Sequence, residues 1–316
     1  MTELLNRREM IAFSTAGVAA AAAATSPSPA AETARGPGEP FSYCLNSGTI
    51  RGQKLSLAEE IEVAAEAGYS GLEPWTRSIQ QYADEGGSLT DLKKRLDELG
   101  LTLESAIGFA AWAVDDDARR AEGVEQMKRE MDLVARLGGR RIAAPPAGCN
   151  RTPGMDLFKI AERYRAILDA GRQIGVVPQL EIWGSSLTLS RIGEAVLVAS
   201  EAGHPDACLL LDAYHIYRGG SSFEGLRLIN GAAMHVFHIN DYPAEPPREE
   251  LTDAHRVFPG DGVAPLPHIL RTMHAAGFRG VLSLELFNRE YWEQDALAVA
   301  RTGLEKTRAV VQKAMA

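Results

Sequence analysis

The sequence lacks several features that would point to common classes of protein. It has only three cysteines in 316 residues, Cys44, Cys149 and Cys208, and their spacing matches no zinc motif and leaves one cysteine over in any disulfide pairing. It has no excess of positive charge: the net charge of −9 disfavours a nucleic-acid backbone as ligand. No GxGxxG motif follows the first expected strand, which argues against an open dinucleotide-binding sheet.

The N-terminal segment has no apolar run long enough for a comfortable membrane span. Arg7 and Arg8 precede an Ala-rich run that ends at Ala24, and small residues suited to signal cleavage follow around 30–34. This arrangement resembles a twin-arginine export signal, which implies passage of the folded protein through the twin-arginine machinery to the periplasm. We therefore expect a signal and cleavage region at 1–34, a short linker at 35–40 and the folded domain at 41–316. The alternative is a plain N-terminal tail.

A repeated pattern fills the remaining chain, which at 45% hydrophobic residues overall can bury a large core. An amphipathic segment ends in glycine, and a short apolar run follows within a few residues. Such a glycine is typical of the left-handed residue just past a helix end. The glycines are Gly68, Gly100, Gly138, Gly175, Gly203 and Gly277. One helix start is also legible, since Ser56 and Glu59 have the spacing of a capping box.

The apolar runs number eight, and they lack the alternation of half-exposed strands, as expected for strands buried on both faces. They lie at 42–46, 70–74, 101–106, 141–145, 177–182, 207–212, 234–239 and 281–286. Eight strand–helix units in one chain predict a closed α/β fold, the (β/α)8 barrel, as a single domain. The main rival is a doubly wound open sheet.

Polar side chains stand at the ends of these strands, where a barrel of this kind places its chemistry. In chain order they are Glu73, Ser105, Pro145 (the one apolar exception), Glu181, Asp212, His238 and Glu285. Taken singly, each charged residue is better explained by a salt bridge, and the histidine by a place in the core. Four consecutive strands ending in Glu, Asp, His and Glu instead predict one divalent ion, Mn²⁺, Mg²⁺, Co²⁺ or Zn²⁺, because converging carboxylates otherwise repel one another. We expect this ion, rather than a lysine or arginine, to be the partner of Asp212.

Several stretches of the second half resemble the xylose isomerase-like barrel superfamily, and within it inosose isomerase and its sugar isomerase and epimerase relatives. They are "LEIWG", "LLLDAYHIYRGG", "FHINDY", "LTDAHRVFPGDG" and "LSLELFNREYW". The resemblance implies that Glu181, Asp212, His238 and Glu285 are the metal ligands, and that Glu181 and Glu285 are the paired acid and base. It also implies that His215 and Arg256 contact substrate oxygens. For His215 the alternative is support of a metal-binding carboxylate, and for Arg256 it is a surface salt bridge.

Other residues near the expected mouth suit a sugar pocket. Trp112 and Trp183, with Trp75 and Phe109, could stack on the apolar faces of a sugar or simply pack under the loops. Glu73 could contact substrate hydroxyls or form a structural salt bridge. The Pro-rich loop 241–256 is expected to cover the mouth.

These expectations together predict an enzyme that removes a proton next to the carbonyl of a sugar, keto-sugar or inosose and returns it through a metal-stabilised enediolate, as an isomerase or epimerase. A lyase or dehydratase on the same site is the alternative, followed by an exported sugar-binding protein without catalysis. An endonuclease IV-like nuclease would need histidines on earlier strands. The expected partner is a small molecule, more plausibly a free or oxidised sugar than a phosphorylated one, and no nucleic acid. The sequence leaves the oligomeric state open, including a homo-oligomer.

Overall fold

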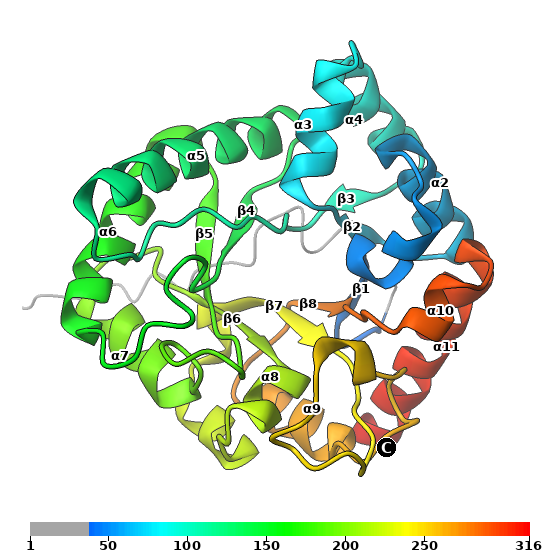
Figure 1. Ribbon diagram of the computed structural model, residues 1–316. Helices are drawn as coiled ribbons and strands as arrows, with labels where there is room; N and C mark the ends of the chain where they lie inside the picture. The colour runs from blue at the N-terminus through cyan, green and yellow to red at the C-terminus, as the bar shows by residue number, and fades with distance from the viewer. Residues whose placement is uncertain (1–37) are drawn as a thin grey trace, which may run out of the picture.

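Eight parallel strands form one sheet in the computed structural model, which describes residues 38–316. They are β1 (Ser42–Asn46), β2 (Gly71–Glu73), β3 (Thr102–Leu103), β4 (Arg141–Ala144), β5 (Val177–Glu181), β6 (Leu209–Asp212), β7 (Met234–Ile239) and β8 (Val281–Leu284). Their order in the sheet is β3-β2-β1-β8-β7-β6-β5-β4. Each lies within or coincides with one of the eight predicted runs, so the (β/α)8 prediction is confirmed (Figure 1).

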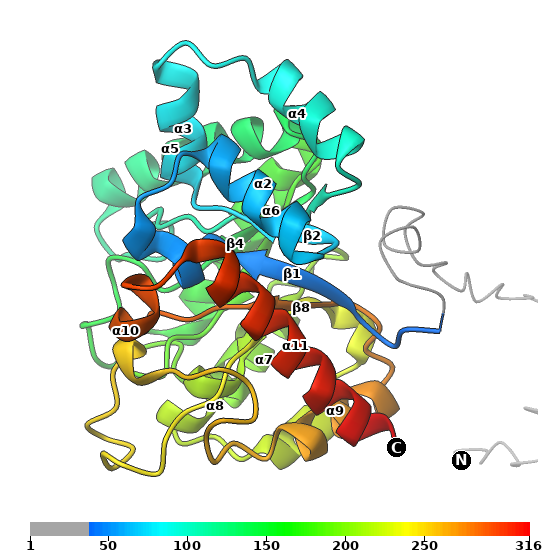
Figure 2. The same cartoon turned by 90° about the vertical axis from the view of Figure 1, so that its right-hand side faces the viewer.

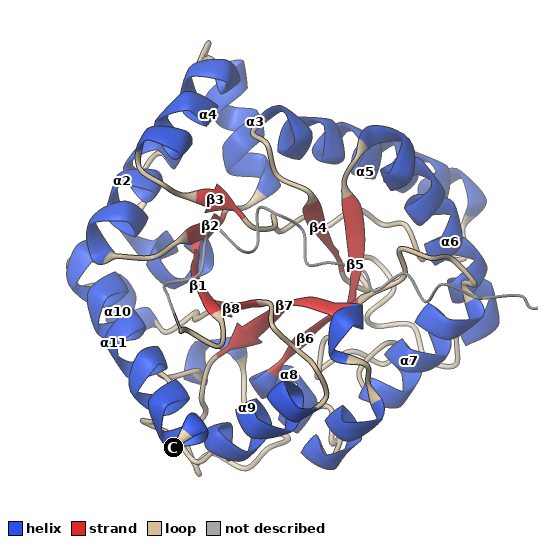
Figure 3. Ribbon diagram, turned by 180° about the vertical axis from the view of Figure 1, so that it is seen from behind, coloured by secondary structure: helices blue, strands red, loops and turns tan. Residues whose placement is uncertain are grey.

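Helices surround the strands on all sides, as Figures 1 and 3 show from the two ends of the barrel. The α-helices are α2 (Leu57–Ala67), α3 (Thr76–Asp84), α4 (Leu89–Glu98), α5 (Asp117–Arg136), α6 (Leu157–Ile174), α7 (Ile192–Glu201), α8 (Ala213–Arg218), α9 (Leu266–Ala275), α10 (Arg289–Trp292) and α11 (Ala296–Met315). Short 3-10 helices are η1 (Ser47–Gln53), η2 (Phe223–Leu228), η3 (Gly231–Ala233) and η4 (Asp253–His255).

The barrel closes between β3 and β4 through an irregular segment rather than a long ladder. The predicted strand 101–106 is shortened to two residues because Pro74, opposite its continuation, has no N–H to donate. Pairing resumes as a single bridge between Trp75 and Ile107. The backbone N–H of Ala143 then donates to the carbonyl of Ala106 at 2.8 Å, which joins β4 to this segment and completes the ring.

The glycines predicted to end helices or follow them all adopt the left-handed conformation. Their φ angles are between 57° and 94° at the six positions named above, where a side chain would cost conformational energy. The capping box is also present, because Ser56 Oγ accepts from the Glu59 N–H and Glu59 accepts from the Ser56 N–H. Local sequence therefore sets the helix ends, and with them the positions at which each strand begins.

Two apolar layers hold the barrel. A large cluster fills the space between strands and helices, and a smaller one fills the interior. The interior cluster contains Cys44, Trp75, Ile107, Ala143, Leu210, Val236 and Val281. It closes the barrel beneath the C-terminal strand ends, so those ends open onto a floor rather than a pore.

The expected signal region 1–34 lies outside the described residues, as does the first half of the linker at 35–40. Within residues 38–316, no helix combines the length and apolar character needed to cross a membrane. Figure 2 shows α10 at the end of the barrel toward which the β1 arrow points, whereas the C-terminus lies at the other end. The strand ends therefore face α10 and its neighbouring loops.

One buried carboxylate on α2 makes the stability of the barrel depend on pH. Glu60 is buried, its Oε2 atom has no hydrogen-bond partner among the described residues, and burial raises its pKa to about 8. The folded state thus favours the neutral acid: this contribution is fully present below the ordinary pKa and is lost as pH rises through about 8.

We therefore expect Glu60→Gln to be more stable than the parent at pH 9, by on the order of 3 kcal/mol, and nearly equal to it at pH 5. Urea unfolding of both proteins at the two pH values checks this. Parallel stability curves at both values would contradict it.

Candidate functional site

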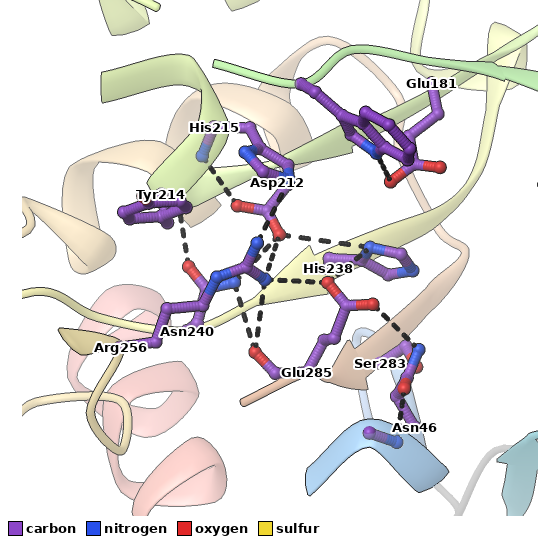
Figure 4. A network of polar contacts seen from close by, with 12 residues as sticks. Asn46, Glu181, Asp212, Tyr214, His215, His238, Asn240, Arg256, Ser283 and Glu285 are labelled. Atoms are coloured by element: carbon purple, nitrogen blue, oxygen red, sulfur yellow. Dashed lines mark hydrogen bonds and ion pairs between the residues drawn. The ribbon is translucent and has the colours of Figure 1, made fainter. Parts of the chain in front are cut away.

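Three side chains of metal-ligand type meet at the C-terminal ends of β6, β7 and β8 (Figure 4). Asp212 ends β6 and lies in register with His238 of β7, and Glu285 directly follows β8. One atom of each lies within 4.8 Å of the other two, and all three side chains are buried. His238 Nδ1 is 3.3 Å from Glu285 Oε2 and 3.9 Å from Asp212 Oδ2. The predicted convergence is thus observed for three of the four strand ends, whereas Glu181 lies outside this group of atoms within 4.8 Å of one another.

Glu73 lies behind His238 rather than in the pocket, so the expectation that it contacts substrate is wrong. Its Oε2 atom is 3.0 Å from His238 Nε2, and it accepts hydrogen bonds from Ser283 Oγ at 2.7 Å and Asn46 Nδ2 at 2.9 Å. Burial opposes the charge, but His238 outweighs it and holds the pKa of Glu73 below its ordinary value. Glu73 therefore fixes Nε2 as the donor and leaves His238 Nδ1 turned toward Asp212 and Glu285.

Asp212, His238 and Glu285 form the floor of the pocket. Glu181, at the end of β5, approaches this floor from another side. The indole N–H of Trp183 donates to its Oε1 at 3.1 Å, while Oε2 is buried and has no hydrogen-bond partner within residues 38–316. Burial, together with the charges of Glu285 and Asp212, outweighs the opposing effect of His238 and raises the pKa of Glu181 to about 8. The pKa of Glu285 is instead lowered, because His238 and Arg256 outweigh its burial. The pKa of Glu181 is thus raised and the pKa of Glu285 is lowered, although both side chains lie in the same pocket.

Asp212 has an arginine partner, which corrects the expectation that only a metal ion would pair with it. The Nη1 atom of Arg256 lies 3.0 Å from Asp212 Oδ2 and 2.7 Å from Glu285 Oε2, so the guanidinium links two of the three converging side chains (Figure 4). Arg256 is buried, so it is no surface salt bridge. Asn240 Nδ2 also donates to Asp212 Oδ2 at 2.9 Å. The other oxygen, Oδ1, accepts the N–H of His215 at 2.8 Å and caps helix α8.

His215 and Arg256 point donor groups at the same place. The Gly184 N–H donates to His215 Nδ1 at 3.2 Å, so the proton of a neutral imidazole lies on Nε2. Burial lowers the pKa of His215 and favours this neutral form. Yet Nε2 faces Arg256 Nη2 at 3.0 Å, and guanidinium is also only a donor. The two donors cannot satisfy each other, and Arg256 Nη2 also donates to Asp253 Oδ1 at 2.7 Å.

The floor has the chemistry and the unsatisfied atoms that suit a divalent cation. Among residues 38–316, the buried cationic groups that face Glu73, Glu181, Asp212 and Glu285 are Arg256 and His238. Two ligand-type atoms, His238 Nδ1 and Glu181 Oε2, are buried without a hydrogen-bond partner in the described part of the chain. Buried polar atoms are costly when unpaired. An ion held by three carboxylates and an imidazole would satisfy both atoms.

Aromatic side chains wall a cavity of about 600 Å³ above this floor. Trp183, Trp75 and Phe109 line it as the sequence suggested, and Phe287 and Trp292 complete the wall. Trp112 does not reach it. Trp112 is fully buried, its indole N–H donates to the Pro145 carbonyl at 2.9 Å, and its ring packs near Tyr164. The expected substrate contact of Trp112 is therefore wrong, and its packing role is confirmed.

The loop at 241–256 covers the mouth with its last residues. Thr252, Asp253 and Arg256 line the cavity, and Asp253 accepts from Arg256 Nη2 at 2.7 Å. The loop is fastened to α8, where Arg218 donates to the carbonyls of Leu251 and Glu249.

Sequence reasoning missed two amides of the floor. Asn46 ends β1, and its Nδ2 donates to both Glu73 and Glu285. Asn46 is found when the end of the first predicted strand is considered together with the ends of the other seven. Asn240 lies two residues after His238, in the stretch "FHINDY", and a polar residue on the same strand face was the available signal.

The chain matches known proteins over most of its length. The model of the family described as "Xylose isomerase-like TIM barrel" matches residues 61–310. An inosose isomerase from Halalkalibacterium halodurans is 30% identical over 274 residues, covering 85% of this chain and 96% of that protein. A 3-dehydroshikimate dehydratase from Pseudomonas aeruginosa is 28% identical over 273 residues, which are 82% of this chain and 41% of that protein.

A solved structure extends the likeness to three dimensions. The crystal structure of the IolI protein with a bound zinc atom superposes with a TM-score of 0.78 at 25% identity, covering 86% of this chain and 98% of that one. Together with the eight-stranded barrel and its Glu, Asp, His and Glu strand ends, the family match settles the membership: the chain belongs to the xylose isomerase-like TIM barrel family.

Proposed function

We propose that the protein is a divalent-metal-dependent enzyme that isomerises or epimerises a sugar, keto-sugar or inosose. The observation that carries the proposal is the floor itself, where Glu181 and Glu285 lie near His238. There the ligand-type atoms Glu181 Oε2 and His238 Nδ1 have no hydrogen-bond partner among residues 38–316. The inosose isomerases among the relatives support this class of substrate.

Glu181, Asp212, His238 and Glu285 would hold the ion. When bound, a divalent ion polarises a carbonyl and stabilises the negative charge that develops on its oxygen. The ligand set suits Mn²⁺, Mg²⁺, Co²⁺ or Zn²⁺, and the zinc reported for the IolI structure supports the last of these.

The residues of the chain divide the remaining work. Glu285 or Glu181 removes the proton next to the substrate carbonyl, and the other returns one to the neighbouring carbon or to the opposite face. If Glu181 Oε2 holds the ion, Oε1, which accepts only the Trp183 indole N–H within residues 38–316, is the oxygen left for proton transfer. His215 Nε2 and Arg256 Nη2 converge on one point, where they hold a substrate oxygen. The aromatic wall excludes water and stacks on the apolar face of the sugar.

The second candidate is a dehydratase, favoured by the 3-dehydroshikimate dehydratase among the relatives. The first proton abstraction is the same, and loss of a β-hydroxyl then replaces reprotonation. The pocket geometry suits both outcomes, so the products distinguish them.

Incubation of the metal-loaded protein in D₂O with neutral ketoses, 2-keto-myo-inositol and 3-dehydroshikimate, followed by NMR, tests the proposal. Deuterated isomers or epimers would support the isomerase, and an unsaturated or aromatic product would support the dehydratase. Absence of exchange in every substrate would overturn both and favour a sugar-binding protein.

We further propose that residues 1–34 direct export by the twin-arginine pathway, that residues 35–40 link them to the barrel, and that the mature enzyme works in the periplasm. The paired Arg7 and Arg8 before an Ala-rich run support this. Replacing both by lysine should keep the protein in the cytoplasmic fraction. Unchanged periplasmic recovery would contradict it.

A further inference from the structure

Two arginines at the rim of the pocket have no ionic partner among residues 38–316. Arg51 of η1 and Arg289 of α10 line the same cavity as Glu181 and Glu285, and both side chains are exposed. Among residues 38–316, no carboxylate lies within 4.0 Å of either guanidinium. Their positive charges are therefore directed at the pocket mouth without being neutralised by the protein.

The carboxylates that line the pocket are already engaged elsewhere. Asp253 and Glu285 pair with Arg256 at 2.7 Å each, and Glu181 accepts from Trp183 at the floor. The acidic groups of the pocket are thus paired with Arg256 or bonded to Trp183, whereas Arg51 and Arg289 have no ion pair among residues 38–316. A substrate that spans the pocket would meet metal-ligand chemistry at one end and arginine at the other.

The rim arginines are held in place by contacts between their segments. The indole N–H of Trp292 donates to the Gly48 carbonyl at 3.1 Å, and Gln53 Nε2 donates to the Tyr291 carbonyl at 2.9 Å. The Arg51 guanidinium also stacks over Trp75, with 4.3 Å between Cζ and the ring centroid. Stacking uses the flat face of a guanidinium and leaves its N–H edges free to bind a planar or tetrahedral oxyanion.

The positive charge of the two rim arginines is opposite in sign to the net charge of the chain. A chain with net charge −9 repels anions at long range. The two rim arginines would therefore act on a group at short range, inside the pocket, and not by attraction at long range.

We propose that Arg51 and Arg289 form a subsite for an oxyanion group of the substrate, a carboxylate or a phosphate, at the end of the molecule remote from the reacting carbonyl. The subsite rests on the proposed function, because it places that carbonyl at the floor. It specifies the substrate as an anionic keto compound rather than a neutral sugar.

Steady-state kinetics of the metal-loaded protein with three substrates tests the subsite. These are neutral 2-keto-myo-inositol, 3-dehydroshikimate with its carboxylate, and fructose 6-phosphate. The variants are Arg51→Gln and Arg289→Gln. Arg77→Gln is the matched control, since Arg77 is exposed and also stacks on Trp75 at 4.2 Å but does not line the pocket.

We expect KM for one anionic substrate to rise by about 10-fold to 100-fold in each rim variant, which is the loss expected for one charge-assisted hydrogen-bonding pair. KM for the neutral substrate should change less than about threefold, and the control should match the parent. Whether the carboxylate or the phosphate compound responds identifies the anion. Equal changes for neutral and anionic substrates, or no change for either, would overturn the subsite.

Calorimetric binding of the two anionic compounds keeps the proposal testable if none of the three is turned over. Weaker binding by the rim variants than by the control would support the subsite while the proposed reaction fails. No binding of either anion by the parent protein, or equal binding by all variants, would overturn it.

Discussion

Replacing Glu285 by glutamine is expected to lower the rate of solvent-deuterium incorporation into a substrate by about a thousandfold, within the range typical of a lost acid–base group. The amide keeps the shape of the side chain but cannot take up a proton at neutral pH. Glu285 is buried and bonded to Arg256 and Asn46, so the glutamine should stay in the same place without acting as a base. NMR of the exchange reaction in D₂O measures the effect.

Two controls separate chemistry from metal loss and from stability. Metal content determined on the purified variant shows whether the ion is still bound, because Glu285 is also a proposed ligand. Glu60→Gln makes the same chemical change on α2, away from the pocket lining, and should retain full exchange. Full exchange in Glu285→Gln as well would remove Glu285 from the acid–base pair.

Replacing Asp212 by alanine is expected to abolish the rise in melting temperature that Mn²⁺ or Zn²⁺ produces in the parent protein. A ligand that binds only the folded state stabilises it in proportion to its affinity. Loss of one carboxylate from a four-ligand set removes charge and a coordinating atom together, so we expect metal affinity to fall at least about 100-fold. Thermal unfolding with and without metal, together with calorimetric titration, measures both quantities.

The alanine variant also leaves Arg256 with one partner fewer and removes the cap of α8, so its metal-free melting temperature should fall too. The informative quantity is therefore the shift on adding metal, not the absolute value. Asp253→Ala is the matched control, since it removes another partner of Arg256 but no proposed ligand. An equal metal shift in Asp212→Ala and in the parent would exclude Asp212 as a ligand.

The fold was readable from the sequence because its signals are local. Most helices carry a side-chain cap at their start or a left-handed glycine at or just past their end, and the strands lie in apolar runs, so these signals do not depend on distant parts of the chain. The shortening of β3 shows the limit. It arises from the missing N–H of Pro74 on the neighbouring strand, and register between strands cannot be read from either segment alone.

The strand-end rule found Glu181, Asp212, His238 and Glu285 because strand direction fixes where those side chains lie. The rule could not distinguish side chains that line the pocket from side chains that hold those in place. It therefore placed Glu73 in the pocket, although Glu73 bonds to the far side of the His238 ring. Loops have no such rule, which is why Trp112 was misplaced. The pairing of Arg256 with Asp212 joins a loop to a strand and depends on the closed barrel.

The cap on helix α8 ties the floor of the site to its cover. Asp212 holds the N–H of His215 at the start of α8, and the same short helix carries Arg218, which fastens the loop at Leu251 and Glu249. A change in the hydrogen bonds of Asp212 is therefore transmitted through the short helix α8 to the loop at 241–256 that covers the mouth. Amide hydrogen exchange at His215 would then report whether a metal ion is bound to Asp212, in the absence of any substrate and without any turnover.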